Sequence, residues 1–425
     1  MKPILSNLCI LNCFLVLLFS SNANPVSEKN DSIKVGVAKV CITPEVPIQM
    51  SGYESRTEPF KGVHDDLFAS ASVFSDGINK AVLISVDVIG FSNSFYEETV
   101  SRINNKTGIK KEAILLSAVH THGGPVSKSY ETNVSPAIEK YVNELQDKIV
   151  NVVIEASGKI QPVKIGTGKG ICNMNINRRA RFADGSIWLG RNPDGICDHE
   201  VSVVRIDDLE NNPIAVLVNW PCHGTVGGQE NYYITGDWPG STARYIEKEL
   251  GDNVIVQVTA GASGDINPIY GPNDKFDDIE AIGMLLGEEA VIITEKIKTA
   301  TSGGINTINK VITAEGKKRL ASRQPNQKLE PGTDRNINLS VIKIGDLVFA
   351  GISGEVMNEI GLKIKVDSPF ENTIVVTHCN GNSGYLCTDE AYPLGGYEVM
   401  VTQTMPGTEL LITDNLQKMI ESVKN

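Results

Sequence analysis

The sequence predicts a mixed α/β (α+β) fold in which helices flank multi-stranded sheets and a zinc site lies at the carboxyl ends of strands. Short apolar runs of strand character alternate with longer segments of helical periodicity along the chain. Four of the apolar runs end in residues that can bind zinc. Because ligands of open α/β sheets bind where the loops after the strands converge, these two observations together indicate one metal site.

The predicted strands are short apolar or alternating runs bounded by Gly, Pro, Asn or Asp. In chain order they span 33–40, 69–74, 81–87, 113–119, 163–168, 201–206, 214–219, 254–259, 308–313, 337–344, 347–352 and 373–377. The predicted helices have apolar residues recurring at three or four positions. They span 95–104, 137–156, 241–250, 278–299, 356–366 and 408–423. No internal repeat is visible, and the polar segment 316–335 is either an exposed loop or a boundary before a smaller subdomain.

The composition of the chain restricts the class of protein that we expect. The chain has 425 residues, 41% of them hydrophobic and 21% charged, as in an ordinary globular protein. The formal net charge is −12, and no dense run of Lys or Arg occurs in the sequence. We therefore expect no nucleic-acid partner, and the sequence implies no partner protein.

The N-terminus has the order of a secretory signal peptide. One Lys precedes the apolar stretch 8–19, and small residues follow at 20–23. We predict a signal peptide over 1–23, a flexible polar segment over 24–32 and one catalytic domain over 33–425. The apolar stretch is too short for a comfortable membrane span, so the mature chain is expected to be exported, either periplasmic or secreted, without a transmembrane segment. A lipid anchor at Cys13 is the alternative, which the apolar residues after Cys13 disfavour.

Four of the predicted strands lead to candidate zinc ligands. The ligands that follow strands 113–119, 214–219, 347–352 and 373–377 are His120, His223, Glu355 and Tyr385. His122 lies two residues after His120, so in an extended segment both imidazoles face the same side. The pair can bind a metal together, or one can bind it while the other transfers protons.

Each candidate ligand also has a structural alternative. His223 could be a buried histidine bonded to the backbone. Glu355 could be an acidic residue in the first turn of the helix predicted to begin there. Tyr385 could be a packed aromatic residue with a hydrogen-bonded hydroxyl.

Taken together, these segments resemble the catalytic domain of the neutral (non-lysosomal) ceramidases. The motifs that carry the resemblance are 36–44, 119–123, 175–178, 223–225, 235–237 and the block from Tyr385 to Tyr397-Glu398. They cover nearly the whole chain after the signal peptide. The family's C-terminal β-sandwich domain is the part that we expect this chain to lack.

The resemblance implies a role for each of seven residues. It implies that zinc is held by His120, His223, Glu355 and Tyr385, that His122 transfers protons, and that Arg178 and Tyr397 bind the carbonyl region of the substrate. Zinc lowers the pKa of bound water to about 7, so the implied reaction is attack of zinc-bound hydroxide on an N-acyl amide bond. An imidazole beside the ligands can take the water proton and protonate the leaving amine. The expected protein is a zinc-dependent amidohydrolase of sphingolipid metabolism with a small-molecule or lipid-like substrate.

One departure from the family pattern leaves the substrate open. Asn267 stands where the family has a serine, which excludes a serine nucleophile at this position. The same metal site could serve an esterase or a carbohydrate-directed hydrolase, for which Trp188, Trp220 and Trp238 could face a sugar. Asn267 also allows a metal-binding protein without turnover.

Two further groups of acidic residues have alternative interpretations. His64 could join a second metal with Asp65 and Asp66, or the three could form an exposed polar loop. Asp237 and Asp265 follow Gly in loops after strands. They could orient a histidine ligand or serve only the geometry of the turns.

Overall fold

Three sheets of the computed structural model share one topology. In each, three antiparallel strands are followed by a crossover helix and an edge strand parallel to the last of the three. The structure describes residues 32–424 except 128–134, 252 and 302. The predicted signal peptide (1–23) and all but the last residue of the polar segment (24–32) lie outside the described residues.

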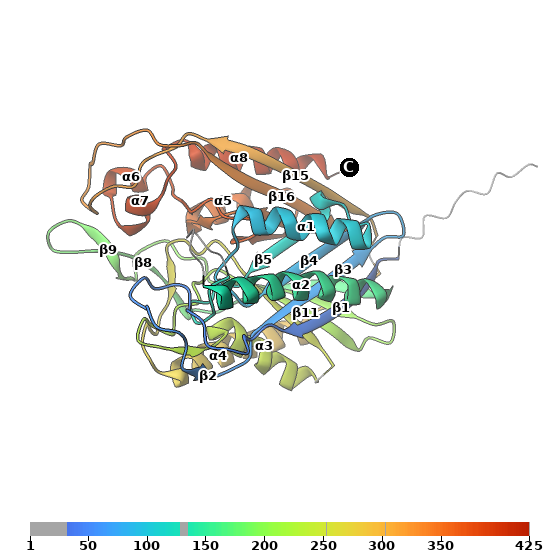
Figure 1. The fold of residues 1–425 in the computed structure, drawn as a ribbon. Helices are drawn as coiled ribbons and strands as arrows, with labels where there is room; N and C mark the ends of the chain where they lie inside the picture. Colours follow the sequence, from blue (N-terminus) through green and yellow to red (C-terminus); the bar gives the residue numbers. More distant parts are fainter. Residues whose placement is uncertain (1–31, 128–134, 252, 302, 425) are drawn as a thin grey trace, which may run out of the picture. The chain divides into compact units, whose positions relative to one another are not determined.

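The first sheet has the strand order β5-β4-β3-β1-β6. Its strands are β1 (Lys34–Cys41), β3 (Phe68–Ser75), β4 (Lys80–Val86), β5 (Ile114–Ala118) and β6 (Gln161–Pro162). Helix α1 (Asn93–Thr107) connects β4 to the parallel strand β5, and α2 (Pro136–Gly158) follows. Both helices pack on each other, and Figure 1 shows them lying along the sheet.

The second sheet repeats this arrangement with the order β13-β11-β10-β7. Its strands are β7 (Lys164–Ile171), β10 (Glu200–Asp207), β11 (Pro213–Trp220) and β13 (Ile255–Ala260). Helix α3 (Asp237–Leu250) connects the parallel strands β11 and β13 and packs on α4 (Phe276–Lys296).

The third sheet has the order β15-β16-β17-β19. Its strands are β15 (Ile305–Ala314), β16 (Arg335–Ile344), β17 (Leu347–Ile352) and β19 (Asn372–Val376). Helix α5 (Asn358–Asp367) connects the parallel strands β17 and β19 and packs on α8 (Thr408–Ser422). Each of these three sheets is therefore covered by its own pair of helices, and we call each sheet with its helix pair a unit.

Local sequence explains where the elements begin and end. Ser92 and Ser135 cap α1 and α2, because each side chain accepts a hydrogen bond from a backbone N–H of the first turn. Pro136 occupies the first turn of α2, where its missing N–H costs nothing. Gly108 ends α1 with a left-handed backbone (φ 73°). All five residues of β5 are buried, as expected for a parallel strand covered on both faces.

The three parallel edge strands meet at the centre of the fold. Ala118 N, at the end of β5, donates to His378 O after β19 (3.1 Å). Thr377 N, also after β19, donates to Ala260 O at the end of β13 (3.0 Å). The carboxyl ends of all three edge strands are thereby joined, and the loops that follow them converge.

Short elements complete the region around these strand ends. They are β2 (Gly62–Val63), β8 (Asn175–Arg181), β9 (Ile187–Asn192), β12 (Tyr233–Ile234), β14 (Ile266–Pro268), β18 (Glu355–Val356), β20 (Tyr385–Leu386), α6 (Ala391–Leu394) and α7 (Tyr397–Val401). The β8–β9 hairpin lies at the same end of the molecule as α6 and α7 (Figure 1), and α7 contacts β9.

The predicted mixed α/β fold is confirmed, and each predicted strand and helix has a counterpart in the structure. Within the segment 316–335, the residues before β16 form a loop: Lys317 N donates to Gln403 O (2.9 Å) and Leu320 N to Met400 O (2.9 Å), so it packs on the end of α7. The topology repeats three times, although the sequence shows no internal repeat. Within the described residues, no helix is long and apolar enough to cross a membrane.

Candidate functional site

The three units place functional groups at equivalent positions. In each unit the crossover helix joins two parallel strands. The third residue after the first of these two strands is Ile89 (after β4), His223 (after β11) and Glu355 (after β17). The second residue after the edge strand is His120 after β5 and His378 after β19. The side chains therefore converge because the strand ends converge.

Three histidines and one carboxylate form the centre of the site. The Nε2 atoms of His120 and His223 lie 3.6 Å and 3.4 Å from Oε2 of Glu355. His122 Nε2 lies 3.4 Å from His120 Nε2. One ring nitrogen from each of the three histidines lies within 4.8 Å of the others, close enough to share one ion.

Backbone carbonyls fix the orientation of two of these rings. His120 Nδ1 donates to Ile89 O (2.7 Å), and His223 Nδ1 donates to Ser263 O (2.7 Å). Because a carbonyl oxygen only accepts, both rings carry their proton on Nδ1 and present the lone pair of Nε2 to the centre. A hydrogen bond on the opposite nitrogen is typical of metal-binding histidines.

The donor set fits a divalent cation. Oε2 of Glu355 is buried and has no hydrogen-bond partner, although it faces two imidazole nitrogens. Acceptors that converge without a proton between them repel each other unless a cation joins them. Imidazole nitrogens with one carboxylate oxygen match the ligand chemistry of zinc.

The electrostatics of the site favour the metal-binding protonation states. Burial lowers the pKa of His223 to about 4, helped by the nearby Arg178 guanidinium. Burial, together with His120 and His223, lowers the pKa of His122 well below its ordinary value. Burial alone would raise the pKa of Glu355, but the neighbouring His120 and His223 rings hold it well below its usual range. Neutral imidazoles and an ionised carboxylate are the forms that bind metals.

Arg178 links the centre to Tyr385. Its Nη2 donates to the Tyr385 hydroxyl (2.9 Å), and its Nη1 lies 3.2 Å from His223 Nε2. Asn267 also reaches this guanidinium, because its Oδ1 accepts from Nη1 (3.3 Å). Burial raises the pKa of Tyr385 well above its ordinary value, and the Glu355 carboxylate adds to the effect.

Glu398 holds Arg178 in place and is a site residue that the sequence reading gave no role. Its two carboxylate oxygens accept from Arg178 Nε and Arg179 Nη1, each at 2.8 Å, and its side chain is 1% exposed. Two of the three arginines in 178–181 are therefore paired with one buried carboxylate.

A row of aromatic rings extends from Tyr385. The ring centroids of Tyr385 and Tyr397 lie 5.7 Å apart, and Trp188 of β9 lies 5.7 Å beyond Tyr397, each pair edge to face. Tyr397 thus belongs to the site through Tyr385. Trp220 and Trp238 are fully buried and pack on each other, so they cannot face a sugar.

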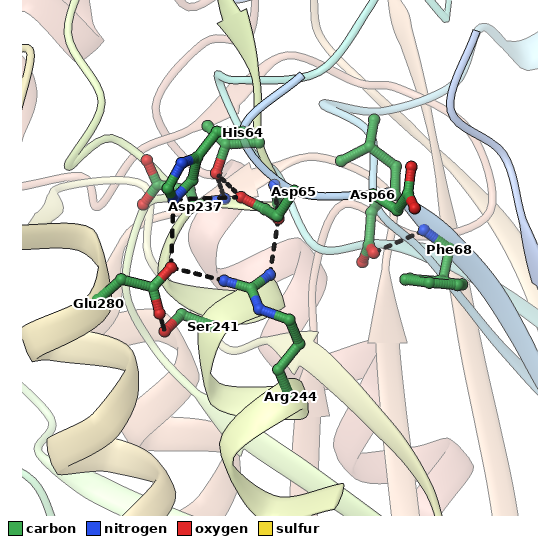
Figure 2. A network of polar contacts seen from close by, with 12 residues as sticks. His64, Asp65, Asp66, Phe68, Asp237, Ser241, Arg244 and Glu280 are labelled. Carbon is green, nitrogen blue, oxygen red and sulfur yellow. Dashed lines mark hydrogen bonds and ion pairs between the residues drawn. The ribbon is translucent and has the colours of Figure 1, made fainter. Parts of the chain in front are cut away.

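A polar network behind the histidine loop supports it. Thr121 Oγ1, between the two histidines, donates to Thr235 O (3.0 Å), and Thr235 N donates to Gly123 O (3.0 Å). Thr235 Oγ1 in turn donates to Asp65 Oδ2 (2.6 Å). Figure 2 shows Asp65 in contact with Arg244, whose Nη1 donates to Asp65 Oδ1 (2.7 Å).

The same network decides the question of a second metal at His64. His64, Asp65 and Glu280 are close enough to hold an ion. However, Arg244 donates to both Asp65 and Glu280 at 2.7 Å and supplies the positive charge (Figure 2). The His64 ring stacks on Phe276 with centroids 3.9 Å apart. We interpret the group as a structural ion-pair network.

Asp237 and Asp265 organise loops. Asp237 accepts from the backbone N–H groups of Val226, Gly227 and Trp238. Asp265 accepts from Asn358 N and from the Asn177 side chain. Among the hydrogen bonds of the described residues, neither carboxylate bonds to a histidine ring.

Comparisons with known proteins concern the sequence and the fold of the chain. The sequence profile of the family described as neutral/alkaline non-lysosomal ceramidase, N-terminal, matches residues 33–276. Neutral ceramidase B of Dictyostelium discoideum is 28% identical over 273 residues, which are 57% of this chain and 37% of that protein. The neutral ceramidase of Pseudomonas aeruginosa is 28% identical over 295 residues, which are 65% of this chain and 43% of that protein.

The fold likeness extends further along the chain than the sequence likeness. A crystal structure of neutral ceramidase from Pseudomonas aeruginosa superposes with a TM-score of 0.78 at 19% identity, covering 92% of this chain and 74% of that one. A structure described as ceramidase complexed with C2 gives a TM-score of 0.80 at 18% identity, covering 92% and 75%. The sequence matches span less than half of each curated relative. Glu355 and Tyr385 lie beyond the residues that the profile matches.

Proposed function

The chain belongs to the neutral/alkaline non-lysosomal ceramidase family, and we propose that it is a zinc-dependent hydrolase that cleaves the N-acyl amide bond of a ceramide-like lipid. The observation that carries the proposal is the convergence of the His120 and His223 Nε2 atoms on the unpartnered Oε2 of Glu355. His120, His223 and Glu355 would hold the ion, with Tyr385 as the fourth ligand. Zinc supplies Lewis acidity that activates water near neutral pH.

His122 is positioned to transfer protons. Its Nε2 faces the centre, and its Nδ1 is buried without a hydrogen-bond partner. Its pKa is lowered, so the ring is neutral and can accept a proton from water. The same ring can then donate that proton to the leaving amine.

Arg178 and Tyr397 are positioned to bind the substrate carbonyl. The Arg178 guanidinium lies 5.6 Å and 5.7 Å from the ring centroids of Tyr385 and Tyr397, so all three groups face one region beside the metal ligands. Donors fixed before the reaction stabilise the negative charge that develops on the carbonyl oxygen. Glu398 keeps the guanidinium fixed from behind.

The remaining expectations belong to the same proposal. We propose export to the periplasm or outside the cell, because of the signal-peptide pattern in 1–23. We also propose that residues 33–425 form one catalytic domain, because the described residues form one compact unit.

Metal analysis and a substrate panel test the proposal. The panel contains a short-chain ceramide, a simple N-acyl amide, the matching ester and a sugar ester, each with the wild type and with His120→Ala. We expect one zinc ion per chain and cleavage of the ceramide analogue in the wild type only. Cleavage of esters but not amides would replace the amidase with an esterase. Turnover that survives both a chelator and His120→Ala would exclude the proposed site.

A further inference from the structure

His378 is a buried histidine at the centre for which the proposed reaction has no use. It lies two residues after β19, as His120 lies two residues after β5. Both have left-handed backbones, with φ 51° for His378 and 64° for His120. Such a conformation is uncommon for residues other than Gly. His378 is therefore the counterpart of His120 in the third repeat.

The two rings stack face to face. Their centroids lie 3.7 Å apart with an angle of 17° between the ring planes, and the His378 residue is 5% exposed. The hydrogen bond from His120 Nδ1 to Ile89 O directs one edge of the ring but does not restrain rotation of the ring plane about that bond. A flat group against the ring face supplies the missing restraint, so Nε2 stays directed at Glu355.

The backbone of His378 ties the same region together. Its N–H donates to Gly354 O (3.1 Å), beside Glu355, and its carbonyl accepts from Ala118 N (3.1 Å), two residues before His120. Any residue other than proline can make these two backbone bonds. The contribution of the ring can therefore be separated from that of the backbone by substitution.

We propose that His378 is a positioning residue of the metal centre: its ring holds the plane of His120 and thereby raises the affinity for the metal. This inference rests on the proposed function, since it assumes that His120 is a ligand. Groups that orient metal ligands typically contribute a factor of about 10–100 to metal affinity.

Three substitutions test the inference, with zinc affinity measured by competition with a chelator. His378→Asn removes the ring but keeps a side chain that tolerates the left-handed backbone, so we expect affinity to fall about 10–100-fold with little change in Tm. His378→Phe keeps a flat ring, so we expect near-wild-type affinity together with a lower Tm, because Phe fits this backbone poorly. The visible spectrum of the cobalt-substituted protein should change for Asn and not for Phe.

His199→Asn is the matched control. It removes a histidine whose Nδ1 lies 2.6 Å from Asn175 Oδ1, outside the group formed by His120, His122, His223 and Glu355. We expect its zinc affinity to equal that of the wild type.

The outcomes separate this inference from the proposed function. A wild type that binds no zinc would refute both. A wild type that binds zinc, with His378→Asn binding it equally well, would refute the positioning role alone. Equal loss in His378→Asn and His378→Phe would also refute it, because the ring face would then not be the cause.

Discussion

Glu398 holds the buried guanidinium groups of Arg178 and Arg179 in place. It is 1% exposed and accepts hydrogen bonds from both Arg178 and Arg179 at 2.8 Å. A buried carboxylate between two guanidiniums is stable only while all three charges are present. Removing it leaves Arg178 uncompensated beside His223 and Tyr385.

Glu398→Gln should therefore destabilise the protein by ~3–5 kcal/mol at neutral pH, measured by denaturant unfolding. The two arginines hold the pKa of Glu398 below its ordinary value, although burial opposes them. Because the pKa of this carboxyl is lower in the folded state than in the unfolded state, its ionised form stabilises the fold at pH values above the unfolded-state pKa. This contribution is lost as the pH falls below about 4. The difference between wild type and variant should shrink over that range. Glu390→Gln, an exposed neighbour, is the control, and an equal loss there would contradict the assignment.

The division of roles between His120 and His122 is a second prediction at this scale. The geometry brings both Nε2 atoms to the centre, so either could bind the ion. We expect His120→Ala to lose zinc, measured as metal content after dialysis. His122→Ala should keep zinc and lose ~10²–10⁴-fold in kcat. Loss of zinc from His122→Ala would make it a ligand rather than a proton carrier.

The sequence predicted the histidines and the carboxylate that lie together at the centre, and it missed the residues that contact them through the backbone or by packing. His120 and His223 were recognisable because each follows an apolar run of strand character. The carbonyls of Ile89 and Ser263 have no signature, because every residue has one. The stacking of His378 on His120 depends on two strands far apart in the chain.

At the scale of elements, the loop 120–123 is held by the segment that precedes α3. Thr121 and Gly123 both bond to Thr235, and the Thr235 hydroxyl bonds to Asp65. The position of the two histidines thus depends on an ion-pair network that joins Asp65 of the first unit to Arg244 and Glu280 of the second (Figure 2).

Substitution at Thr235 tests this dependence. Thr235→Val keeps the shape but removes the hydroxyl, so Asp65 loses a donor and we expect zinc affinity to fall roughly tenfold. Thr235→Ser keeps the hydroxyl and should bind zinc as tightly as the wild type. Chelator competition measures both variants. Equal zinc affinities of Thr235→Val and Thr235→Ser would show that the backbone hydrogen bonds of Thr235 are enough to hold the loop 120–123.

Elements were predicted correctly where burial alone determines the sequence pattern, and they were missed where an ion pair stabilises a strand of charged residues. Buried parallel strands such as β5 and β19 are continuous apolar runs. Strand β8 (Asn175–Arg181) carries three arginines and was missed, because Glu398 on a distant helix satisfies two of them. Helix α3 begins at Asp237 rather than 241, since Pro239 is tolerated in a first turn.

At the scale of the whole molecule, three units with one topology surround one centre. Their equivalence was invisible in the sequence because equivalent positions hold chemically different residues, such as Ile89, His223 and Glu355. Insertions such as the β8–β9 hairpin also differ between units. The three units repeat one backbone topology, whereas each unit contributes different side chains to the centre.

Removal of the metal should loosen the contact between the units. A ligand that binds only the folded state stabilises it by ~2.7 kcal/mol at a free concentration of 100 Kd. We expect a chelator to lower Tm and added zinc to restore it, measured by calorimetry. His120→Ala should show neither change. A wild-type Tm that does not respond to zinc would mean that the ion does not bridge the units.

The distribution of the ligands over three crossovers has a consequence for assembly. The proposed ligands come from all three sheets, so a chain in which the last sheet has not joined the other two cannot offer the complete set. Under the proposed zinc binding, ion capture is therefore a late event in maturation, and we expect the zinc stoichiometry of a preparation to measure the fraction of molecules whose tertiary structure is complete.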